Sequence, residues 1–402
     1  MDVEKIRNDF PFFSEQDQLV YFDNACSTLK PAKVLDAMSE YDRLYSTCGG
    51  RSINRLGEWV TEAVSGSRKS IASFIGASKP EEVVFVRNTT EAINLLAYSL
   101  SLSAGDVVLT SDKEHNSNLV PWQQKSLREG IVHQVVGTDA DGKLDMEAYQ
   151  KQLSSGRVKL VAMVWVSNLD GVSFPVSEVV EMAHRHGALV FLDAAQAAPH
   201  HDIDVSKLGV DFLAFSGHKL CGPSGIGVLY GKEEAICQLK PFMTGGSTVE
   251  TATYDNHKLL QYPAMFEAGT QDYSGIIGLS SAVRYVQDIG MENIHEHVTK
   301  LNVRATEGLL SIPNLSIIGP ATADLRGGIL SFNIKNTDIH EIAIVLDRSA
   351  GIMVRSGAHC VHSWYHSRDI FGSVRASFYF YNTLSEVDKF VESVESISSL
   401  YS

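Results

Sequence analysis

The chain has 402 residues, of which 44% are hydrophobic, and its formal net charge is −14 at pH 7. This length predicts a large buried core divided between two domains. An acidic chain without basic clusters is not typical of nucleic-acid binding, and no apolar run approaches the roughly 20 residues that span a bilayer. The first residues, MDVEKIRNDFPFF, lack the apolar stretch of a signal peptide, and the five cysteines lack metal-site spacing. We therefore expect a cytoplasmic protein with no nucleic-acid partner, no membrane partner and no bound metal.

Short apolar runs alternate with helical patterns through the first two thirds of the chain. The runs predicted as strands cover residues 19–25, 81–87, 105–111, 158–168, 187–195 and 210–217. Most of them are nearly continuous in apolar residues, which is typical of a parallel sheet covered on both faces. Helical patterns at 90–100 and 176–187 lie between strands, and glycine ends the second. The alternation predicts a doubly wound α/β domain with right-handed crossovers.

The pattern changes after about residue 265, where two long helices are followed by short strands. The helices are expected at 275–290, 293–312, 338–351 and 384–401, and the strands at 314–320, 327–334, 352–357 and 373–382. This order favours a smaller α+β domain with helices on one face of an antiparallel sheet. We expect residues 1–18 to pack on that small domain, residues 19–265 to form the large domain, and residues 266–402 to form the small one.

Polar residues follow several of the predicted parallel strands, at the edge of the sheet where ligands usually bind. Thr89 and Thr90 open a helix whose N-terminus could take a phosphate, although a plain helix cap is the alternative. Asp193 and Gln196 end another strand, and Lys219 follows the next. An acid and a lysine at one sheet edge suit pyridoxal phosphate, which needs an amine for a Schiff base and an acid for its pyridine nitrogen.

Three further residues fit this cofactor. Ser216 and His218 could donate to its phosphate, and the His115 ring could stack on the pyridine and take part in proton transfer. The alternative for Lys219 is a strand-end lysine that only reaches towards solvent. The pair His200 and His201 lacks metal-ligand spacing, so we expect it to be solvated or to cap a helix.

Nine stretches, spread over essentially the whole chain, resemble the SufS/CsdA-type cysteine desulfurases, in the class V aminotransferase branch of the fold-type I pyridoxal-phosphate enzymes. In order, they read FDNACSTLKP, RNTTEAINL, EHNSNLVPW, VSNLDG, LDAAQAAPHHDIDV, FSGHKLCGPSGIGVLYG, FEAGTQDYSGIIGL, VRSGAHC and VRASFYFYNT. The resemblance implies a large domain with a mostly parallel seven-stranded sheet and a smaller α+β domain that carries a catalytic cysteine loop. It also implies a homodimer and conversion of L-cysteine to L-alanine.

The resemblance implies a role for each matching position. Lys219 forms the Schiff base and moves the Cα proton, and Cys360 is the nucleophile that keeps the sulfur as a persulfide. Arg355 and His359 could stabilise the Cys360 thiolate. The residues expected around the cofactor are Thr89, Thr90, His115, Asp193, Gln196, Ser216, His218, Lys219 and Tyr273. The residues expected around the substrate are Ala25, Asn168, Arg355 and Arg375. The persulfide would pass to an acceptor protein, for iron–sulfur cluster assembly or another thiolation pathway.

The sequence departs from the family pattern at several of these stretches. Arg51, in GGRSIN, and Tyr273 lie where contacts to the second subunit are expected, with residue types that differ from the usual ones. Cys26 replaces a usual alanine, and either inert packing or a sulfur relay would explain it. Three other functions stay open at this point: a selenocysteine lyase, a cysteine sulfinate desulfinase and a non-catalytic scaffold with the same fold.

Overall fold

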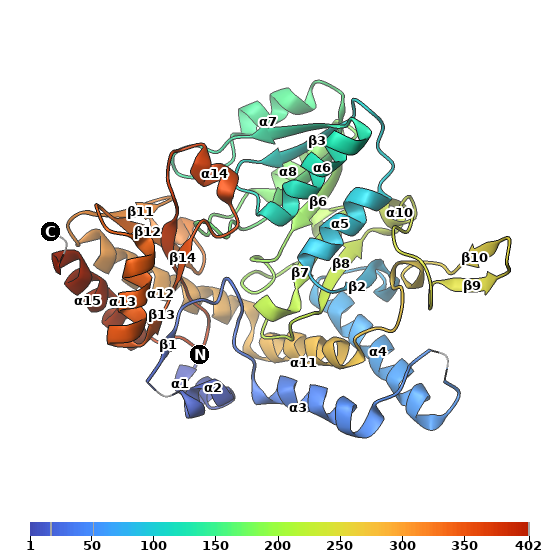
Figure 1. The fold of residues 1–402 in the computed structure, drawn as a ribbon, viewed down its shortest axis with the longest axis horizontal. Coiled ribbons are helices and arrows are strands. Elements are labelled where there is room, and N and C mark those ends of the chain that lie inside the picture. The colour runs from blue at the N-terminus through green and yellow to red at the C-terminus, as the bar shows by residue number, and fades with distance from the viewer. Residues whose placement is uncertain (17, 51, 401–402) are drawn as a thin grey trace.

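The computed structural model describes residues 1–16, 18–50 and 52–400. The predicted cross-subunit contact of Arg51 lies outside these residues. The chain forms a seven-stranded sheet with helices on both faces and, beside it, a four-stranded sheet with its own helices (Figure 1). This arrangement confirms the predicted α/β class with a mostly parallel seven-stranded sheet.

The large sheet has the strand order β2-β8-β7-β6-β5-β3-β4. Its strands are β2 (Val83–Val86), β3 (Val107–Ser111), β4 (Val132–Val136), β5 (Val158–Val164), β6 (Leu189–Asp193), β7 (Phe212–Ser216) and β8 (Gly227–Gly231). Strand β8 runs antiparallel to both of its neighbours, and the other pairs are parallel. The sequence patterns had not predicted β4 or β8.

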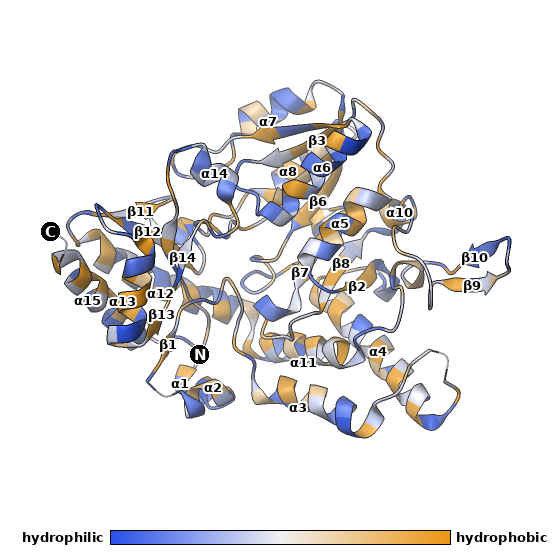
Figure 2. Ribbon diagram, viewed as in Figure 1, coloured by the Kyte–Doolittle hydropathy of each residue, from blue (hydrophilic) through white to orange (hydrophobic). Residues whose placement is uncertain are grey.

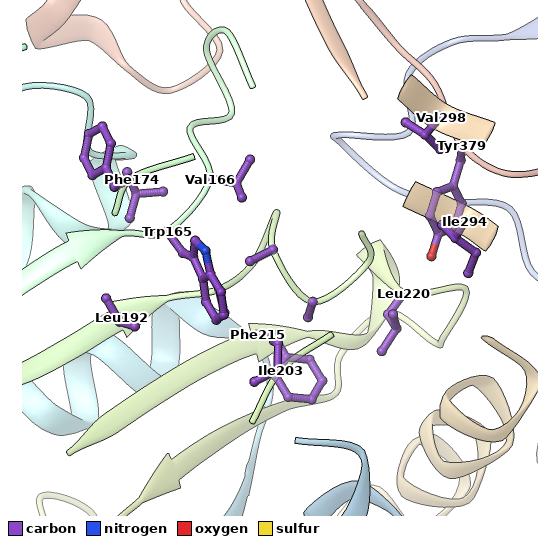
Figure 3. Packing of buried hydrophobic residues seen from close by; sticks show 14 of the residues in the cluster. Trp165, Val166, Phe174, Leu192, Ile203, Phe215, Leu220, Ile294, Val298 and Tyr379 are labelled. Atoms are coloured by element: carbon purple, nitrogen blue, oxygen red, sulfur yellow. The ribbon is translucent and has the colours of Figure 1, made fainter. Parts of the chain in front are cut away.

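Both faces of this sheet are buried, which explains the unbroken apolar runs. Successive residues of a strand point to opposite faces, and Phe191 and Leu192 accordingly belong to two different apolar clusters. Figure 3 shows Phe215 and Ile203 close together, with Leu192 farther away in the same apolar cluster. The helices around the large sheet are α4 (Arg55–Phe74), α5 (Thr89–Ser99), α6 (Val120–Glu129), α7 (Met146–Leu153), α8 (Val176–Arg185), α9 (Val205–Leu208) and α10 (Glu233–Ile236).

The second sheet is antiparallel throughout, with the order β11-β12-β15-β14. Its strands are β11 (Leu315–Ile318), β12 (Ile329–Ile334), β14 (Arg355–Gly357) and β15 (Ser373–Ser377). Helices α12 (Met291–Leu310), α13 (Ile339–Ala350), α14 (His362–His366) and α15 (Leu384–Leu400) belong to the same part of the chain. In Figure 2, α13 carries both hydrophilic and hydrophobic residues, as expected of a helix with one buried side.

Helix α11 (Tyr273–Ile289) packs against α3 (Ala32–Glu40) and α4, beneath the large sheet. Helix α11 follows the proposed domain boundary near residue 265, yet it contacts α4, which is a helix of the large sheet. The boundary therefore stays a prediction. The hairpin of β9 (Val249–Ala252) and β10 (His257–Leu259) projects from the body of the protein (Figure 1). No helix within the described residues combines the length and apolarity that crossing a membrane requires.

The N-terminal segment joins the two sheets. Helices α1 (Val3–Arg7) and α2 (Pro11–Glu15) precede β1 (Val20–Tyr21), which pairs in parallel with β13 (Ile352–Met353). The predicted strand at 19–25 therefore exists over two residues, and its partner lies in the last third of the chain. After β1, Asp23 forms a bridge with Ser377, and the Thr28 amide donates to the His218 carbonyl at 2.8 Å. The segment thus runs from the small sheet to the end of β7.

His200 is buried, although the sequence suggested a solvated or helix-capping residue. His200 is 8% exposed, and its ring packs edge-on against Tyr379 with 5.2 Å between ring centroids. The expectation that this residue is solvated is wrong, because the chain after β15 covers it. Its neighbour His201 stacks against Trp165 instead.

Candidate active site

One cavity of about 270 Å³ lies where β5, β6 and β7 end and where the cysteine loop after β14 approaches them. All but one of the site residues that the sequence indicated line it: Ala25, Thr89, Thr90, His115, Asn168, Asp193, Gln196, Ser216, His218, Lys219, Arg355, Cys360 and Arg375. Carboxyl ends of parallel strands meet at one edge of a sheet, so side chains far apart in sequence converge there.

Lys219 and Asp193 bring opposite charges into this cavity. Asp193 is the last residue of β6, between β5 and β7, and its Oδ1 accepts the Ala195 amide at 2.9 Å. Burial raises the pKa of Asp193, and the Lys219 cation opposes that rise. The Lys219 side chain reaches the cavity from the turn after β7, and burial lowers its pKa while Asp193 raises it. Each charge therefore favours the ionised form of the other.

His115 is held as a neutral ring. The Ser117 amide donates to His115 Nδ1 at 3.1 Å, so Nδ1 is an acceptor and the ring proton sits on Nε2. Burial first, and then the nearby Lys219 cation, lowers the pKa of His115 to about 3. The preceding residue, Glu114, fixes the turn by accepting from the Ser111 hydroxyl and the Val164 amide. A neutral, anchored ring can stack on a flat ligand without adding charge.

Hydroxyl groups gather at the start of α5. Ser216 Oγ accepts the Thr89 amide at 2.9 Å and lies 2.7 Å from Thr89 Oγ1. Thr90 Oγ1 lies 2.7 Å from Ser117 Oγ. Asn88 is the N-cap of α5 rather than Thr90, which leaves both threonine hydroxyls facing the cavity region. Hydroxyl donors at a helix N-terminus form a binding site suited to a phosphate.

Three buried polar atoms on residues that line the cavity lack a partner among the described residues. One is His359 Nδ1, and the other two are Asn168 Oδ1 and Arg375 Nε, on side chains that are 5% and 2% exposed. Arg375 Nη1 donates to the Asn168 carbonyl at 2.9 Å, and Asn168 Nδ2 donates to the His359 carbonyl at 2.7 Å. Buried polar groups are normally satisfied, so these atoms have capacity to bind a polar ligand.

Cys360 lies in a tight turn after β14. Its backbone carbonyl accepts the Asn116 amide at 2.7 Å, and both His359 and Cys360 have left-handed backbone, with φ of 48° and 59°. The His359 ring donates from Nε2 to the Ser373 carbonyl at 3.1 Å, and burial lowers its pKa to about 2. His359 is therefore neutral and brings no positive charge to a Cys360 thiolate, contrary to the sequence-based expectation.

Arg355 faces a different thiol from the one that the sequence suggested. Its Nη1 donates to Cys26 Sγ at 2.7 Å and lies 3.8 Å from Asp23 Oδ2. Asp23 also lies 3.5 Å, through Oδ1, from Arg375 Nη2. Sequence analysis missed Asp23, Ser117 and Glu114 as site residues. The only signal for Asp23 was its place beside Cys26 in FDNACST.

Tyr273 is the site residue that this cavity does not include. It begins α11, and its hydroxyl donates to the Gly49 carbonyl at 3.5 Å. Tyr273, Gly49 and Gly50 line a second cavity of about 290 Å³. Its contact with the cofactor stays a prediction. No three His, Cys, Asp or Glu side chains come together as a metal site in the part of the chain that the structure describes.

The profile of the family described as "Aminotransferase class-V" matches residues 20–390. A probable cysteine desulfurase of Streptomyces coelicolor is 40% identical, over all of this chain and 98% of its own length. A cysteine desulfurase of Haloferax volcanii is 38% identical, with the same coverage of both chains. The apo structure of a cysteine desulfurase from Thermococcus onnurineus NA1 is similar with a TM-score of 0.94, 40% identity and 98% coverage of each chain. The structure of CsdA, a cysteine desulfurase from Escherichia coli, gives a TM-score of 0.91 and 31% identity, over 100% of this chain and 99% of that one.

Proposed function

This chain belongs to the class-V aminotransferase family, and on that premise we propose its function: it is a pyridoxal-phosphate-dependent cysteine desulfurase, which converts L-cysteine to L-alanine and retains the sulfur. The observation that carries the proposal is the single cavity lined by Lys219, Asp193 and Cys360. A scaffold without catalysis has no need to gather an amine, a carboxylate and a thiol around one cavity.

The residues present fit the cofactor. Lys219 would hold its aldehyde carbon, Asp193 its pyridine nitrogen, and the neutral His115 ring would stack on it. Gln196 Nε2 donates to the Ala25 carbonyl at 2.7 Å and keeps a second hydrogen for the ring oxygen. The phosphate would lie against the hydroxyls and the helix start described above, which comprise Thr89, Thr90, Ser216 and, with its ring, His218. When bound, pyridoxal phosphate withdraws electrons from the substrate Cα.

The opposite end of the cavity suits the substrate carboxylate. Arg375 Nε and Asn168 Oδ1 are buried there and have no partner among the described residues. The Arg375 guanidinium can donate in a bidentate manner to a carboxylate, and the Asn168 oxygen can accept from the substrate amine. Ala25 has no side-chain bulk beyond Cβ and borders this space. Binding there orients the Cα–H bond of the substrate towards Lys219.

The sulfur leaves the substrate through Cys360. Lys219 Nζ takes the Cα proton and returns a proton to the product, which is the task of a positioned amine whose pKa is lowered. The Cys360 thiolate attacks the substrate sulfur, so an S–S bond forms while the carbon–sulfur bond breaks. L-cysteine and the enzyme thiol thereby become L-alanine and a persulfide on Cys360, with all atoms accounted for.

The experiment is an alanine assay on the purified holoenzyme with L-cysteine and a reductant. We expect stoichiometric alanine and sulfide, and loss of both in Cys360→Ala. The exposed Cys237→Ala serves as the matched control and should keep wild-type turnover. Comparison with L-selenocysteine and cysteine sulfinate tests the related lyase and desulfinase activities. The proposal fails if L-cysteine yields no alanine, or if alanine formation from L-cysteine survives the loss of Cys360.

We also propose that the enzyme is a homodimer that works in the cytoplasm and passes its sulfur to an acceptor protein for iron–sulfur cluster assembly or thiolation. Large side chains are exposed in this structure, such as Ile53 at 96% exposure and Tyr254 on the projecting hairpin. A second subunit would cover them. Phe371, which is 99% exposed on the segment after α14, could contact an acceptor near Cys360. All five cysteines are free, as a reducing compartment favours. Light scattering should give the mass of two chains, and a monomer at micromolar concentration would contradict the dimer.

A further inference from the structure

The cavity contains a second thiol, on Cys26. This residue follows β1 on the N-terminal segment, and its side chain lines the same cavity as Cys360 and Lys219. Both thiols lie close enough to Lys219 for their negative charge to raise its pKa. Cys221 offers a contrast within the same chain, because it is fully buried and burial raises the pKa of its thiol. Cys26 therefore does not have the environment of a packing cysteine.

The groups around Cys26 are those that a charged sulfur needs. Arg355 Nη1 donates to Cys26 Sγ at 2.7 Å. Because an arginine side chain has only hydrogen-bond donors, the sulfur is the acceptor in this contact. Arg375, which is 2% exposed, adds a second guanidinium to this end of the cavity, and its Nε has no partner. Among the described residues, Asp23 is the carboxylate that contacts both arginines. Two cations against one carboxylate leave a net positive charge at this end of the cavity, which can stabilise a thiolate or a persulfide anion.

The turn of Cys360 places this residue at the wall of the cavity that Cys26 also lines. Cys360 lies between α14 and β14, the strand that begins with Arg355. Cys360 is the second of two successive residues with left-handed backbone. Arg355 and Arg375 are direct neighbours on paired strands of the small sheet. The same strand thus supplies the cation at Cys26 and leads into the turn of Cys360.

We propose that Cys26 is a second sulfur-carrying site, which receives the sulfane sulfur from Cys360 and frees that thiol for another turnover. The inference rests on the proposed function, since that reaction supplies the Cys360 persulfide. The Cys26 thiolate attacks the terminal sulfur of the protonated persulfide. A new S–S bond forms on Cys26, the S–S bond on Cys360 breaks, the proton stays on the transferred sulfur, and Cys360 leaves as a thiolate. No oxidant or reductant is needed.

The test counts sulfur and alanine separately in the holoenzyme. Enzyme is mixed with excess L-cysteine without reductant or acceptor, and alanine and cyanolysable sulfane sulfur per subunit are measured. Alkylation and mass spectrometry then locate each persulfide. We expect two alanines and two sulfane sulfurs in the wild type, with persulfides on Cys26 and Cys360. Cys26→Ala should yield one of each, on Cys360, and Cys26→Ser should do the same. Cys237→Ala, the matched control outside the cavity, should yield two.

Three results would overturn the inference. One is a wild type that carries a single sulfane sulfur on Cys360, as the Cys26→Ala variant does. Another is a disulfide between Cys26 and Cys360 with release of hydrosulfide in place of a second persulfide. The third is a persulfide on Cys26 in Cys360→Ala, which would mean direct attack rather than transfer. Absence of alanine would refute the proposed function itself, whereas alanine with sulfur on Cys360 alone refutes only the role of Cys26.

Discussion

Replacement of Lys113 by methionine should destabilise the protein more than replacement of Lys113 and Asp170 together. The two side chains form an ion pair in which each is 1% exposed, and Lys113 Nζ also donates to the Gly142 carbonyl at 3.1 Å. Asp170 Oδ1 accepts the Val172 amide at 3.2 Å. The pair thus fixes the loop after β5 that carries Asn168. Lys113→Met leaves a carboxylate buried without its cation.

Loss of one partner from a buried ion pair costs about 3–5 kcal/mol of unfolding free energy. The buried Arg326 guanidinium interacts with Asp170 electrostatically and offsets part of that cost, so we expect about 3 kcal/mol. In Lys113→Met/Asp170→Asn the charge is gone, and the asparagine oxygen can still accept the Val172 amide. What remains lost is the hydrogen bond to Gly142 and the attraction between Asp170 and the buried Arg326, so the double variant should lose about 2 kcal/mol.

Scanning calorimetry of the holoenzyme at pH 7 measures the difference. At about 2 °C per kcal/mol for a large chain, the single variant should melt about 6 °C below the wild type and the double variant about 4 °C below. Lys143→Met is the matched control, since Lys143 is half exposed and lies 3.9 Å from Asp141 at the surface. It should leave the Tm unchanged. A single variant that melts at or above the double variant would refute the reasoning.

Three more predictions concern the site and its surroundings. Lys219→Ala should lose the visible absorbance of bound cofactor and all alanine formation, and unchanged absorbance would exclude Lys219 as the attachment point. Arg375→Lys, which replaces a planar fork with a point charge, should raise the KM for L-cysteine about tenfold or more with a smaller change in kcat; an unchanged KM would remove Arg375 from the carboxylate site. Burial lowers the pKa of His200 to about 3 and that of His201 to about 4. The unfolded chain takes up these protons near pH 6.5 and the folded protein only near pH 4 or below, so Tm should fall as pH falls through this range. The fall should be smaller in His200→Phe, and an equal fall in both proteins would contradict the assignment.

The large sheet was predictable from the sequence wherever a strand is central and buried on both faces. Strands β5, β6 and β7 are nearly continuous in apolar residues, with only Lys159 interrupting β5, and each run is followed or ended by polar residues that line the cavity. Strand β4 was missed because it is an edge strand, and its sequence VHQVV includes two polar residues that are only partly buried. Strand β8 was missed because it begins and ends with glycine and pairs with its neighbours in an antiparallel manner.

Pairings between distant segments were not predictable, because no local pattern encodes them. The run at 19–25 has the apolar character of a strand, yet nothing in it indicates β13 as its partner. The contact between Arg355 and Cys26 joins residues 329 positions apart. From the sequence alone, Arg355 was expected beside the thiol five residues later in VRSGAHC. The backbone of β14 instead directs its side chain towards the N-terminal segment.

That segment determines how the two sheets together form one site. The Ala25 amide donates to Ser377 Oγ on β15 at 2.9 Å, while the Ala25 carbonyl accepts from Gln196 after β6. A single residue is thereby bonded to both sheets at the cavity wall. Asp23, two residues earlier, contacts Arg375 from the small sheet. Burial raises the pKa of Asp23, and the two arginines that it contacts, Arg375 and Arg355, oppose that rise. The position of Arg375 relative to the large sheet is therefore set by residues near the N-terminus rather than by either sheet alone.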